Sequence, residues 1–190
     1  MNNFLKSLGA FVVDVLETAI ISLSIFIISF LLIFQLHEVN GQSMDGIDKF
    51  HDGQRLITDK ITYRFRDPER GEVIIFKFNR NDEYIKRIIG LPGESIEIKE
   101  GQVYIYNSEH TDGFMLDESE YLDSSVITTG REFLKEGAKI DITEDHYVVM
   151  GDNRRESYDS RAWGFVAKES VVGRSIIRYW PPNEMGLIDN

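Results

Sequence analysis

The feature that most constrains this chain is an apolar run near its beginning, over residues 8–36. From residue 18 to residue 36 the run carries no charged side chain. A helix needs roughly 20 predominantly apolar residues to cross a bilayer, and this run exceeds that length. Asp14 and Glu17 give the first turns a polar side, so we expect them at the membrane interface. The sequence therefore predicts one transmembrane helix, with the lipid bilayer as a partner.

A cleavable signal peptide and a buried core helix both fit the apolar run less well. A cleavable signal peptide has a shorter apolar segment followed by a small-x-small cleavage site, and no such site follows this run. A core helix of a soluble domain keeps a polar face, whereas this run is apolar on all sides. Lys6 is the one cation before the run, so the positive-inside rule favours a cytoplasmic amino terminus and an extracytoplasmic domain.

Length and composition limit the remaining possibilities. A chain of 190 residues is long enough for one anchor, expected over residues 1–37, and one compact domain, expected over residues 38–190. The absence of cysteine excludes disulfides, thiolate metal sites and thiol catalysis. The net charge of -11 argues against nucleic acid as a partner, because binding nucleic acid depends on neutralising phosphates.

The histidines give no sign of a metal site. Two histidines one helical turn apart are a common zinc-binding arrangement, and no pair here has that spacing. We therefore expect neither a metal nor a cofactor. The four histidines are His37, His51, His110 and His146.

Behind the apolar run the sequence changes to short segments rich in β-branched and aromatic residues. Such segments, separated by turn residues, are typical of strands. We expect a mostly β domain of antiparallel sheets with little helix, in which the strands of residues 54–106 form a β-meander. The predicted strands cover residues 54–60, 72–78, 84–89, 95–99, 102–106, 139–142, 146–150 and 171–180.

A stretch at about residues 107–138 interrupts this pattern. It is polar and acidic, and it lacks a regular apolar spacing. Low hydrophobicity of this kind favours irregular or disordered structure. We therefore expect a surface insertion in the β domain that is ordered only in part.

Ser43 is the candidate nucleophile, because it lies in the segment VNGQSM, residues 39–44, just after the apolar run. Gly41 lets the backbone come close to another chain. Met44 offers a flexible apolar surface beside the serine. A serine hydroxyl is a poor nucleophile until a neighbouring base takes its proton, so the chain must also supply a base.

Lys86 is the candidate base. Strand alternation places it on one face with Tyr84 and Ile88, between bulky apolar neighbours. The pKa of a lysine in water is about 10.4, and burial in apolar surroundings lowers it. A serine–lysine pair is therefore chemically possible. From the strand alone, a solvated lysine whose stem covers apolar surface remains the open alternative.

A polar loop with the sequence GDNRRESYDSR, residues 151–161, is the third candidate element. Asp152, Asp159 and Arg161 could form a charge-paired lattice, since arginine and carboxylate pair in a two-pronged geometry. Ser157 could then orient an amine. A solvated hairpin is the open alternative for this loop.

Together these segments resemble bacterial type I signal peptidases. The resemblance covers most of residues 39–180, and its strength comes from several short motifs in the right order behind a membrane helix. The motifs are Ser43-Met44, KRIIGLPGE at residues 86–94, GDNR followed by S-x-DSR within residues 151–161, and VVGR at residues 171–174.

The resemblance implies a fold and a set of roles. The fold would be the mostly antiparallel β fold of that family, behind one N-terminal transmembrane helix. Ser43 would be the nucleophile, its backbone N–H would donate to the oxyanion, and Lys86 would be the general base. Ser157 would hold the Lys86 amine. The residues expected to brace the loop are Asp152, Asp159 and Arg161.

The resemblance also implies a substrate. An extended peptide would pair with the Lys86 strand, and shallow pockets would accept small side chains. The expected partners are signal peptides of preproteins, the bilayer, and other membrane or secretion proteins. Gly41 stands where some relatives carry a hydroxyl residue that assists the oxyanion. The residues expected to form the substrate site are Val39, Gly41, Met44, Tyr84 and Ile85.

One departure from the family pattern follows the Ser-Met pair. Relatives usually continue with one residue, then proline, then threonine or serine, whereas this chain has Asp45, Gly46 and Ile47. Losing the proline frees the backbone after the nucleophile, so we expect a looser turn and slower or more specialised catalysis.

The sequence therefore favours a membrane-anchored serine endopeptidase that removes signal peptides from exported proteins. A catalytically weak or silent paralogue that binds signal peptides or membrane partners is the main alternative. A third possibility is a serine–lysine protease that cuts itself or a regulator.

Overall fold

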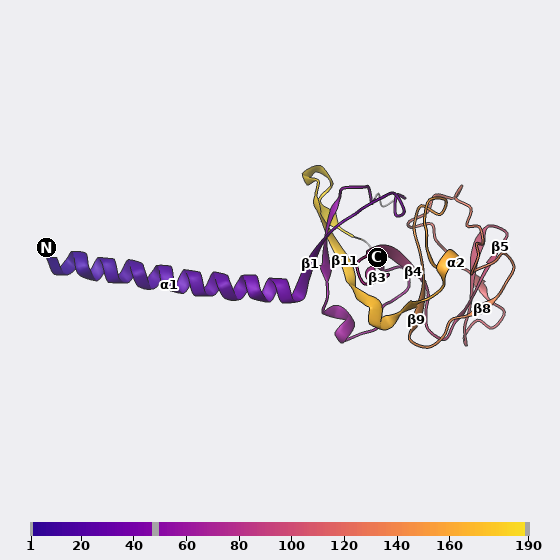
Figure 1. Ribbon diagram of the computed structural model, residues 1–190, viewed down its shortest axis with the longest axis horizontal. Coiled ribbons are helices and arrows are strands. Elements are labelled where there is room, and N and C mark those ends of the chain that lie inside the picture. The colour runs from indigo at the N-terminus through magenta and orange to yellow at the C-terminus, as the bar shows by residue number, and fades with distance from the viewer. Residues whose placement is uncertain (1, 47–49, 189–190) are drawn as a thin grey trace.

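The computed structural model describes residues 2–46 and 50–188, with side chains from residue 7 onward. A long helix leads into a β domain (Figure 1). Helix α1 (Asn2–Ile33) includes a 27-residue stretch, Ser7–Ile33, that is long and apolar enough to cross a membrane and is exposed along its length. The predicted helix is confirmed, but it ends before residue 36. Residues from Phe34 onward form a strand instead, because they pair with a partner in the β domain.

The β domain contains two antiparallel sheets in the part of the chain that the structure describes. The larger sheet has eight strands in the order β1-β2-β11-β3-β4-β9-β10, with β12 beside β11, and the smaller has the order β7-β6-β5-β8. This confirms the predicted fold class. The strands are β1 (Phe34–Glu38), β2 (Arg55–Asp59), β3 (Val73–Lys77), β4 (Glu83–Gly90), β5 (Ser95–Lys99), β6 (Gln102–Tyr106), β7 (Phe114–Met115), β8 (Ile140–Asp141), β9 (His146–Met150), β10 (Val166–Ala167), β11 (Val171–Trp180) and β12 (Gly186–Leu187).

Little of the domain is helical. A short helix, α2, follows the polar loop, and the carboxylate of Asp159 caps it by accepting a hydrogen bond from the Arg161 N–H. The helical elements of the domain are α2 (Ser160–Trp163) and the 3₁₀ helices η1 (Thr62–Arg64), η2 (Lys168–Ser170) and η3 (Pro182–Glu184).

The predicted meander is wrong, because strands distant in the sequence lie side by side. β11 pairs with both β2 and β3, and β9 pairs with β4. Gly173 permits one of these contacts, since a Cβ there would lie 2.1 Å from the carbonyl oxygen of Asp59. Apolar alternation marks strands but does not specify their partners, so the pairing could not be read from local pattern.

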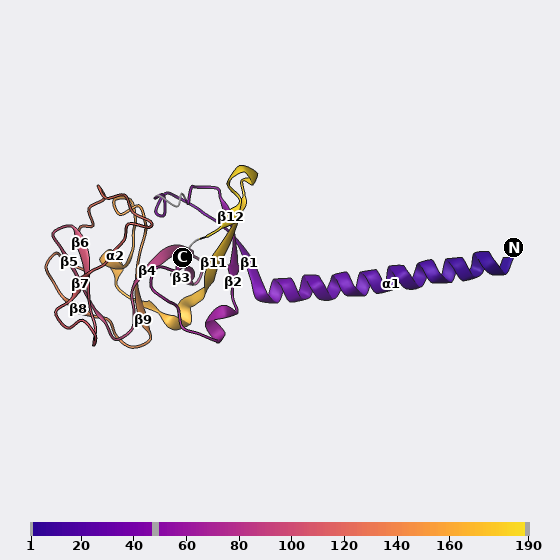
Figure 2. The same ribbon diagram turned by 180° about the vertical axis from the view of Figure 1, so that it is seen from behind.

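Three apolar clusters hold the domain together. One lies beneath the segment around Ser43 and includes Val39, Met44 and Leu56. A second packs Phe76 and Trp163 with the strands on the other side of the large sheet. The third fills the space under the small sheet, which lies at the end of the domain farthest from α1 (Figures 1 and 2).

The stretch at about residues 107–138 is more ordered than its composition predicts. The structure describes all of it, and Leu116, Tyr121, Leu122 and Leu134 are buried in the cluster beneath the small sheet. The expectation of a partly ordered surface insertion is therefore corrected. A few widely spaced apolar residues in a polar background dock this stretch, and such spacing gives no periodic signal.

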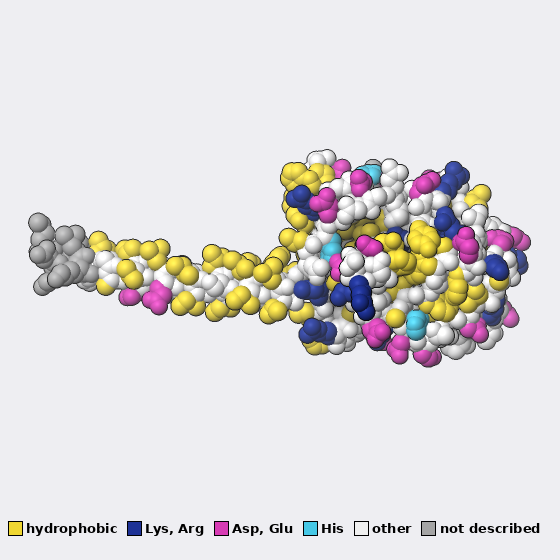
Figure 3. Space-filling model, viewed as in Figure 1, with side chains coloured by type: hydrophobic (Ala, Val, Ile, Leu, Met, Phe, Trp, Pro, Cys, Tyr) yellow, Lys and Arg dark blue, Asp and Glu magenta, His cyan; other side chains and the backbone are white. Residues whose placement is uncertain are grey.

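The outer surfaces of the two parts differ. Apolar side chains cover α1, whereas lysine, arginine and carboxylate side chains are mixed over the β domain (Figure 3). At the junction, the Lys60 ammonium donates a hydrogen bond to the carbonyl oxygen of Leu31 at 3.0 Å. A cation at this position satisfies a free carbonyl at the helix end and favours its dipole.

Candidate active site

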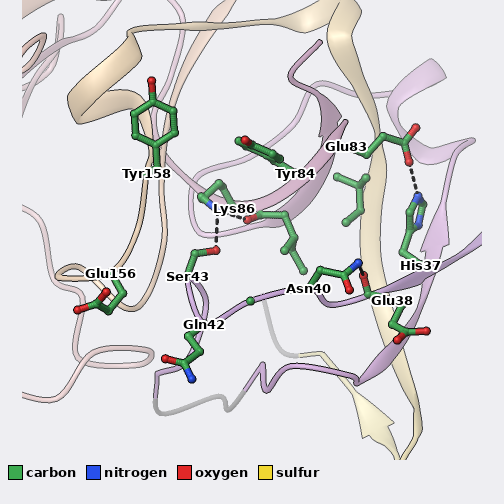
Figure 4. Close-up of a pocket in the computed structure, with 13 residues that line it drawn as sticks. His37, Glu38, Asn40, Gln42, Ser43, Glu83, Tyr84, Lys86, Glu156 and Tyr158 are labelled. Atoms are coloured by element: carbon green, nitrogen blue, oxygen red, sulfur yellow. Dashed lines mark hydrogen bonds and ion pairs between the residues drawn. The ribbon is translucent and has the colours of Figure 1, made fainter. Parts of the chain in front are cut away.

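The structure brings Ser43 and Lys86 into direct contact. Ser43 lies in the turn that follows β1, and Lys86 extends from β4. The Lys86 Nζ is 2.7 Å from the Ser43 Oγ and 2.8 Å from the carbonyl oxygen of Ile85 (Figure 4). The solvated-lysine alternative is therefore excluded, since Lys86 is only 4% exposed.

Burial sets the electrostatics of Lys86. Removal from water lowers the pKa of its amine from 10.5 to about 8, because burial disfavours the charged form. The negative charges of Asp159 and Asp152 act in the opposite direction but do not cancel the effect of burial. The Tyr84 ring lies 5.5 Å from Nζ. A substantial fraction of neutral amine is therefore available near neutral pH, next to the hydroxyl.

The turn that carries Ser43 is held by backbone hydrogen bonds. The Asp45 N–H donates to the Gln42 carbonyl at 3.1 Å, and the Asn153 N–H donates to the Ser43 carbonyl at 3.1 Å. Within residues 2–46 and 50–188, the Ser43 N–H has no hydrogen-bond acceptor. It is thus free to donate to a bound oxygen atom.

Gly151 allows the polar loop to approach the nucleophile. A Cβ at this position would lie 2.1 Å from the Ser43 carbonyl oxygen and 2.3 Å from the Ser157 Oγ, so a side chain does not fit. The Gly151 N–H donates to the Asp159 carboxylate at 3.1 Å. The beginning of the loop is therefore fixed against the backbone of Ser43.

The predicted charge lattice exists as two separate ion pairs. Asp159 pairs with Arg161 at 2.8 Å, as predicted, whereas Asp152 pairs with Arg87 at 2.8 Å rather than with Arg161. Burial alone would raise the pKa of Asp159, but hydrogen bonds and the charge of Arg161 outweigh it and hold that pKa below its usual range. The hairpin is therefore not a solvated one.

Ser157 does not hold the Lys86 amine in this structure. Its hydroxyl is fully buried beside Gly151, and within the described ranges it forms no hydrogen bond to Lys86. Its oxygen is directed toward the region of Gly151 and Ser43 instead. Ser157 therefore contacts the loop near the nucleophile but not the base.

A cavity of about 320 Å³ opens over the two reactive atoms. Gly41, Tyr84 and Ile85 line it, in agreement with the expected substrate site. Val39 and Met44 do not, since both are buried in the apolar cluster beneath the cavity. Gly41 has a φ of 88°, and open space surrounds it, so glycine is favoured there by the backbone conformation.

Several supporting residues were missed by the sequence analysis. Arg87 binds Asp152 and lies over the Tyr121 ring, with its guanidinium carbon 4.2 Å from the ring centre. Arg154 in the polar loop pairs with Glu118 and contacts Thr128, both from the stretch at about residues 107–138. Arg87 follows Lys86 directly, so strand alternation directs its side chain to the opposite face, but no local signal identifies Glu118 as a partner.

The arrangement suits acyl transfer through a serine. A hydroxyl and a buried amine meet at one open cavity, and the backbone N–H of the same serine has no acceptor within the described ranges. These are a nucleophile, a base and an oxyanion donor in the geometry that covalent catalysis needs. Among the residues described, no group of histidines and carboxylates could hold a metal ion.

Known proteins with similar sequences share one description. A "Probable signal peptidase I-2" from Synechocystis sp. is 39% identical over 157 residues, which are 79% of this chain and 65% of that protein. A "Signal peptidase I" from Leptolyngbya laminosa is 34% identical over 70% of this chain and 63% of its own length. This chain thus spans less than two thirds of the length of each of these two relatives. A "Signal peptidase IB" from Staphylococcus aureus is 33% identical over 87% of this chain and 90% of its own length.

One solved structure and one family description are also similar to this chain. The crystal structure of a signal peptidase I from Enterococcus faecalis is 32% identical, with a TM-score of 0.44 over 57% of this chain and 97% of that chain. Residues 12–180 match the family described as Signal peptidase, peptidase S26. Because this match covers most of the sequence, the chain belongs to the signal peptidase S26 family.

Proposed function

We propose that this protein is a membrane-anchored serine endopeptidase that cleaves N-terminal signal peptides from exported preproteins. Ser43 is the nucleophile and Lys86 is the general base. The observation that carries this proposal is the 2.7 Å contact between the Ser43 Oγ and the buried Lys86 Nζ. Membership of the signal peptidase family supports the choice of substrate.

The reaction begins when neutral Lys86 takes the proton of the Ser43 hydroxyl. The Ser43 oxygen attacks the scissile carbonyl carbon, and the Ser43 N–H donates a hydrogen bond to the resulting oxyanion. When the tetrahedral intermediate collapses, the C–N bond breaks and the Lys86 ammonium gives its proton to the leaving amine. The signal peptide remains bound to Ser43 as an ester.

Hydrolysis of this ester completes the cycle. Lys86, neutral again, takes a proton from a water molecule that attacks the ester carbonyl carbon. The C–O bond to Ser43 breaks, the serine oxygen recovers its proton from Lys86, and the signal peptide leaves with a carboxyl terminus. The Ile85 carbonyl accepts a hydrogen bond from the amine and so orients Nζ toward Ser43.

Four buried residues of the polar loop, which lie outside the cavity lining, position these groups: Asp152, Ser157, Asp159 and Arg161. Asp159 holds the Gly151 N–H, and the pair of Asp159 with Arg161 keeps that carboxylate in place. Asp152 directly follows Gly151, and its carboxylate is held in place by a hydrogen bond from Arg87. Ser157 is proposed as a positioning residue that packs against Gly151.

The substrate binds as an extended peptide beside β4. Gly41, Tyr84 and Ile85 line the cavity, and Val39 and Met44 support this region from the buried apolar cluster without lining the cavity. Backbone pairing supplies affinity, and the restricted space favours small side chains near the scissile bond.

The proposed location follows from α1. The helix anchors the chain in the bilayer, with the amino terminus on the cytoplasmic side and the β domain on the opposite face. The exposed apolar surface of Ser7–Ile33 supports the anchor. Lys6 supports the orientation through the positive-inside rule.

The test is cleavage of a preprotein by the purified full chain in detergent or bilayers. Wild-type protein is expected to release a shortened mature protein, and Ser43→Ala is expected to abolish this release while binding persists. Unchanged cleavage by Ser43→Ala would contradict the assignment. Binding of the preprotein by the wild type without any cleavage would instead support the silent-paralogue alternative, which is favoured by Gly46 at the usual proline position.

A further inference from the structure

The cavity over Ser43 and Lys86 has an excess of carboxylates on its walls. Glu38, Glu83 and Glu156 all line it. Among the residues described, Lys86 is the sole lysine or arginine of the lining, and its amine is committed to Ser43 and to the backbone. A bound peptide therefore meets a negatively charged surface.

The Glu83 carboxylate is fixed in position. Its Oε2 lies 3.0 Å from the His37 Nε2, and the His37 Nδ1 lies 2.9 Å from the hydroxyl of Thr58, which is fully buried. The two ring nitrogens of His37 thus lie within hydrogen-bond distance of the Thr58 hydroxyl and the Glu83 carboxylate, and the Gln35 amide nitrogen lies 3.1 Å from the same Nε2. The contact between His37 and Glu83 joins β1 to β4 on one side of the cavity, so the charge of Glu83 stays at the wall.

Glu156 supplies a charge at the other end of the cavity. His37 and Glu83 lie on one side of the Ser43–Lys86 pair, and Glu156 lies on the opposite side (Figure 4). Within the described part of the chain, the Glu156 carboxylate has no hydrogen-bond or ion-pair partner. A peptide that lies across Ser43 thus passes one fixed and one unpaired carboxylate, on opposite sides of its scissile bond.

We propose that Glu83 and Glu156 select the substrate by charge. This inference rests on the proposed peptidase function and narrows its substrate class. At substrate positions outside the pockets for small side chains, preproteins with lysine or arginine are cleaved faster than those with aspartate or glutamate. Glu83 sets the preference on one side of the bond, and Glu156 sets it on the other.

The expected size of the change in kcat/KM follows from the strength of partly exposed ion pairs. Pairs of this kind change an equilibrium by roughly two- to fivefold, and salt weakens them. We therefore expect kcat/KM to differ by about two- to fivefold between a neutral and a charged residue at a sensitive position, and the difference to shrink at high salt. A purely structural role of Glu83 would not depend on the charge of the substrate.

The experiment uses the full chain in detergent and preproteins that carry lysine, glutamine or glutamate on both sides of the cleavage site, at positions outside the pockets for small side chains. The ratio of kcat/KM for the lysine and glutamate substrates is the readout. Glu83→Lys is expected to reverse this ratio on one side only, and Glu156→Lys on the other side only. Glu83→Gln is expected to bring the ratio close to one without adding a new charge.

Glu169→Lys is the matched control, because Glu169 is exposed on η2, lies outside the cavity lining and changes the net charge equally. It is expected to leave every ratio as in the wild type. Ratios that do not change in the Glu83 and Glu156 variants, or that change equally in the control, would overturn the inference. If the wild type cleaves none of these substrates, the proposed function itself fails instead.

Discussion

The two faces of β4 bury cations in different ways. On one face Lys86 is buried, its amine contacts only neutral polar groups, and it has no carboxylate within ion-pair distance among the described residues. On the other face Arg87 is equally buried but forms a two-pronged pair with Asp152. A cation buried without a paired carboxylate loses its proton readily, whereas one paired with a carboxylate keeps it and braces the structure.

The comparison explains why adjacent residues have such different tasks. Lys86 needs a lowered pKa, and a close carboxylate would raise that pKa and leave the amine charged. Arg87 keeps its charge in any protein environment and so suits a permanent contact. The strand separates the two environments by directing neighbouring side chains to opposite faces.

The largest expected effect concerns the base. Lys86→Met removes the amine but keeps an apolar side chain of similar length, so cleavage should fall by at least about 10³-fold. Stability should not fall, because the cost of burying an amine disappears. Rates of preprotein cleavage and thermal unfolding in detergent measure the two effects.

Lys99→Met, an exposed position on β5, serves as the control for Lys86→Met and should change neither property. If Lys86→Met cleaves preproteins at a rate within tenfold of the wild type, a difference of about 1.4 kcal/mol in activation free energy, the distinction drawn between the two faces of β4 is wrong.

The second largest effect is expected on stability and concerns Arg87, on the opposite face of β4. Arg87→Met leaves the Asp152 carboxylate buried without its partner, which typically costs about 3–5 kcal/mol. The double variant Arg87→Met/Asp152→Leu removes both charges and should recover much of this loss. Unfolding midpoints in detergent measure the difference. If Arg87→Met alone is as stable as the wild type, the ion pair of Arg87 with Asp152 does not stabilise the fold.

A smaller effect concerns the turn after the nucleophile. A Cβ at Gly46 would lie 2.9 Å from the Asp152 Cβ and 3.2 Å from the Tyr121 carbonyl oxygen. Gly46→Pro, which introduces the usual family residue, should therefore destabilise the protein by about 1–3 kcal/mol through overpacking. It should also fail to increase the cleavage rate. If Gly46→Pro is as stable as the wild type and cleaves faster, the turn has room for proline, and glycine only makes its backbone more flexible.

Local pattern in the sequence predicted the elements of the fold well and their partners poorly. The strand segments and the membrane helix follow from apolar spacing, which is a local property. The placement of β11 between β2 and β3 depends on contacts between distant residues. The docking of Tyr121 and Glu118 against Arg87 and Arg154 likewise has no local signal.

The candidate site was predicted to a similar extent. Motif order suggested Ser43 and Lys86 as partners, and the structure places them in contact. Two expectations were not observed: Ser157 does not bind the Lys86 amine, and Asp152 does not join Asp159 and Arg161 in one lattice. Both depend on side-chain directions within a folded loop, which local pattern does not give. Ile47, one of the departures from the family pattern, lies outside the described residues.

The pH dependence of single-turnover cleavage tests the central claim most directly. Because burial lowers the pKa of Lys86 to about 8, the neutral amine becomes more abundant as pH rises toward that value. The rate of the first chemical step should therefore rise about tenfold per pH unit below this pKa and level off above it. A rate that stays constant across this range, or that levels off only near the ordinary lysine pKa of 10.5, would contradict the account.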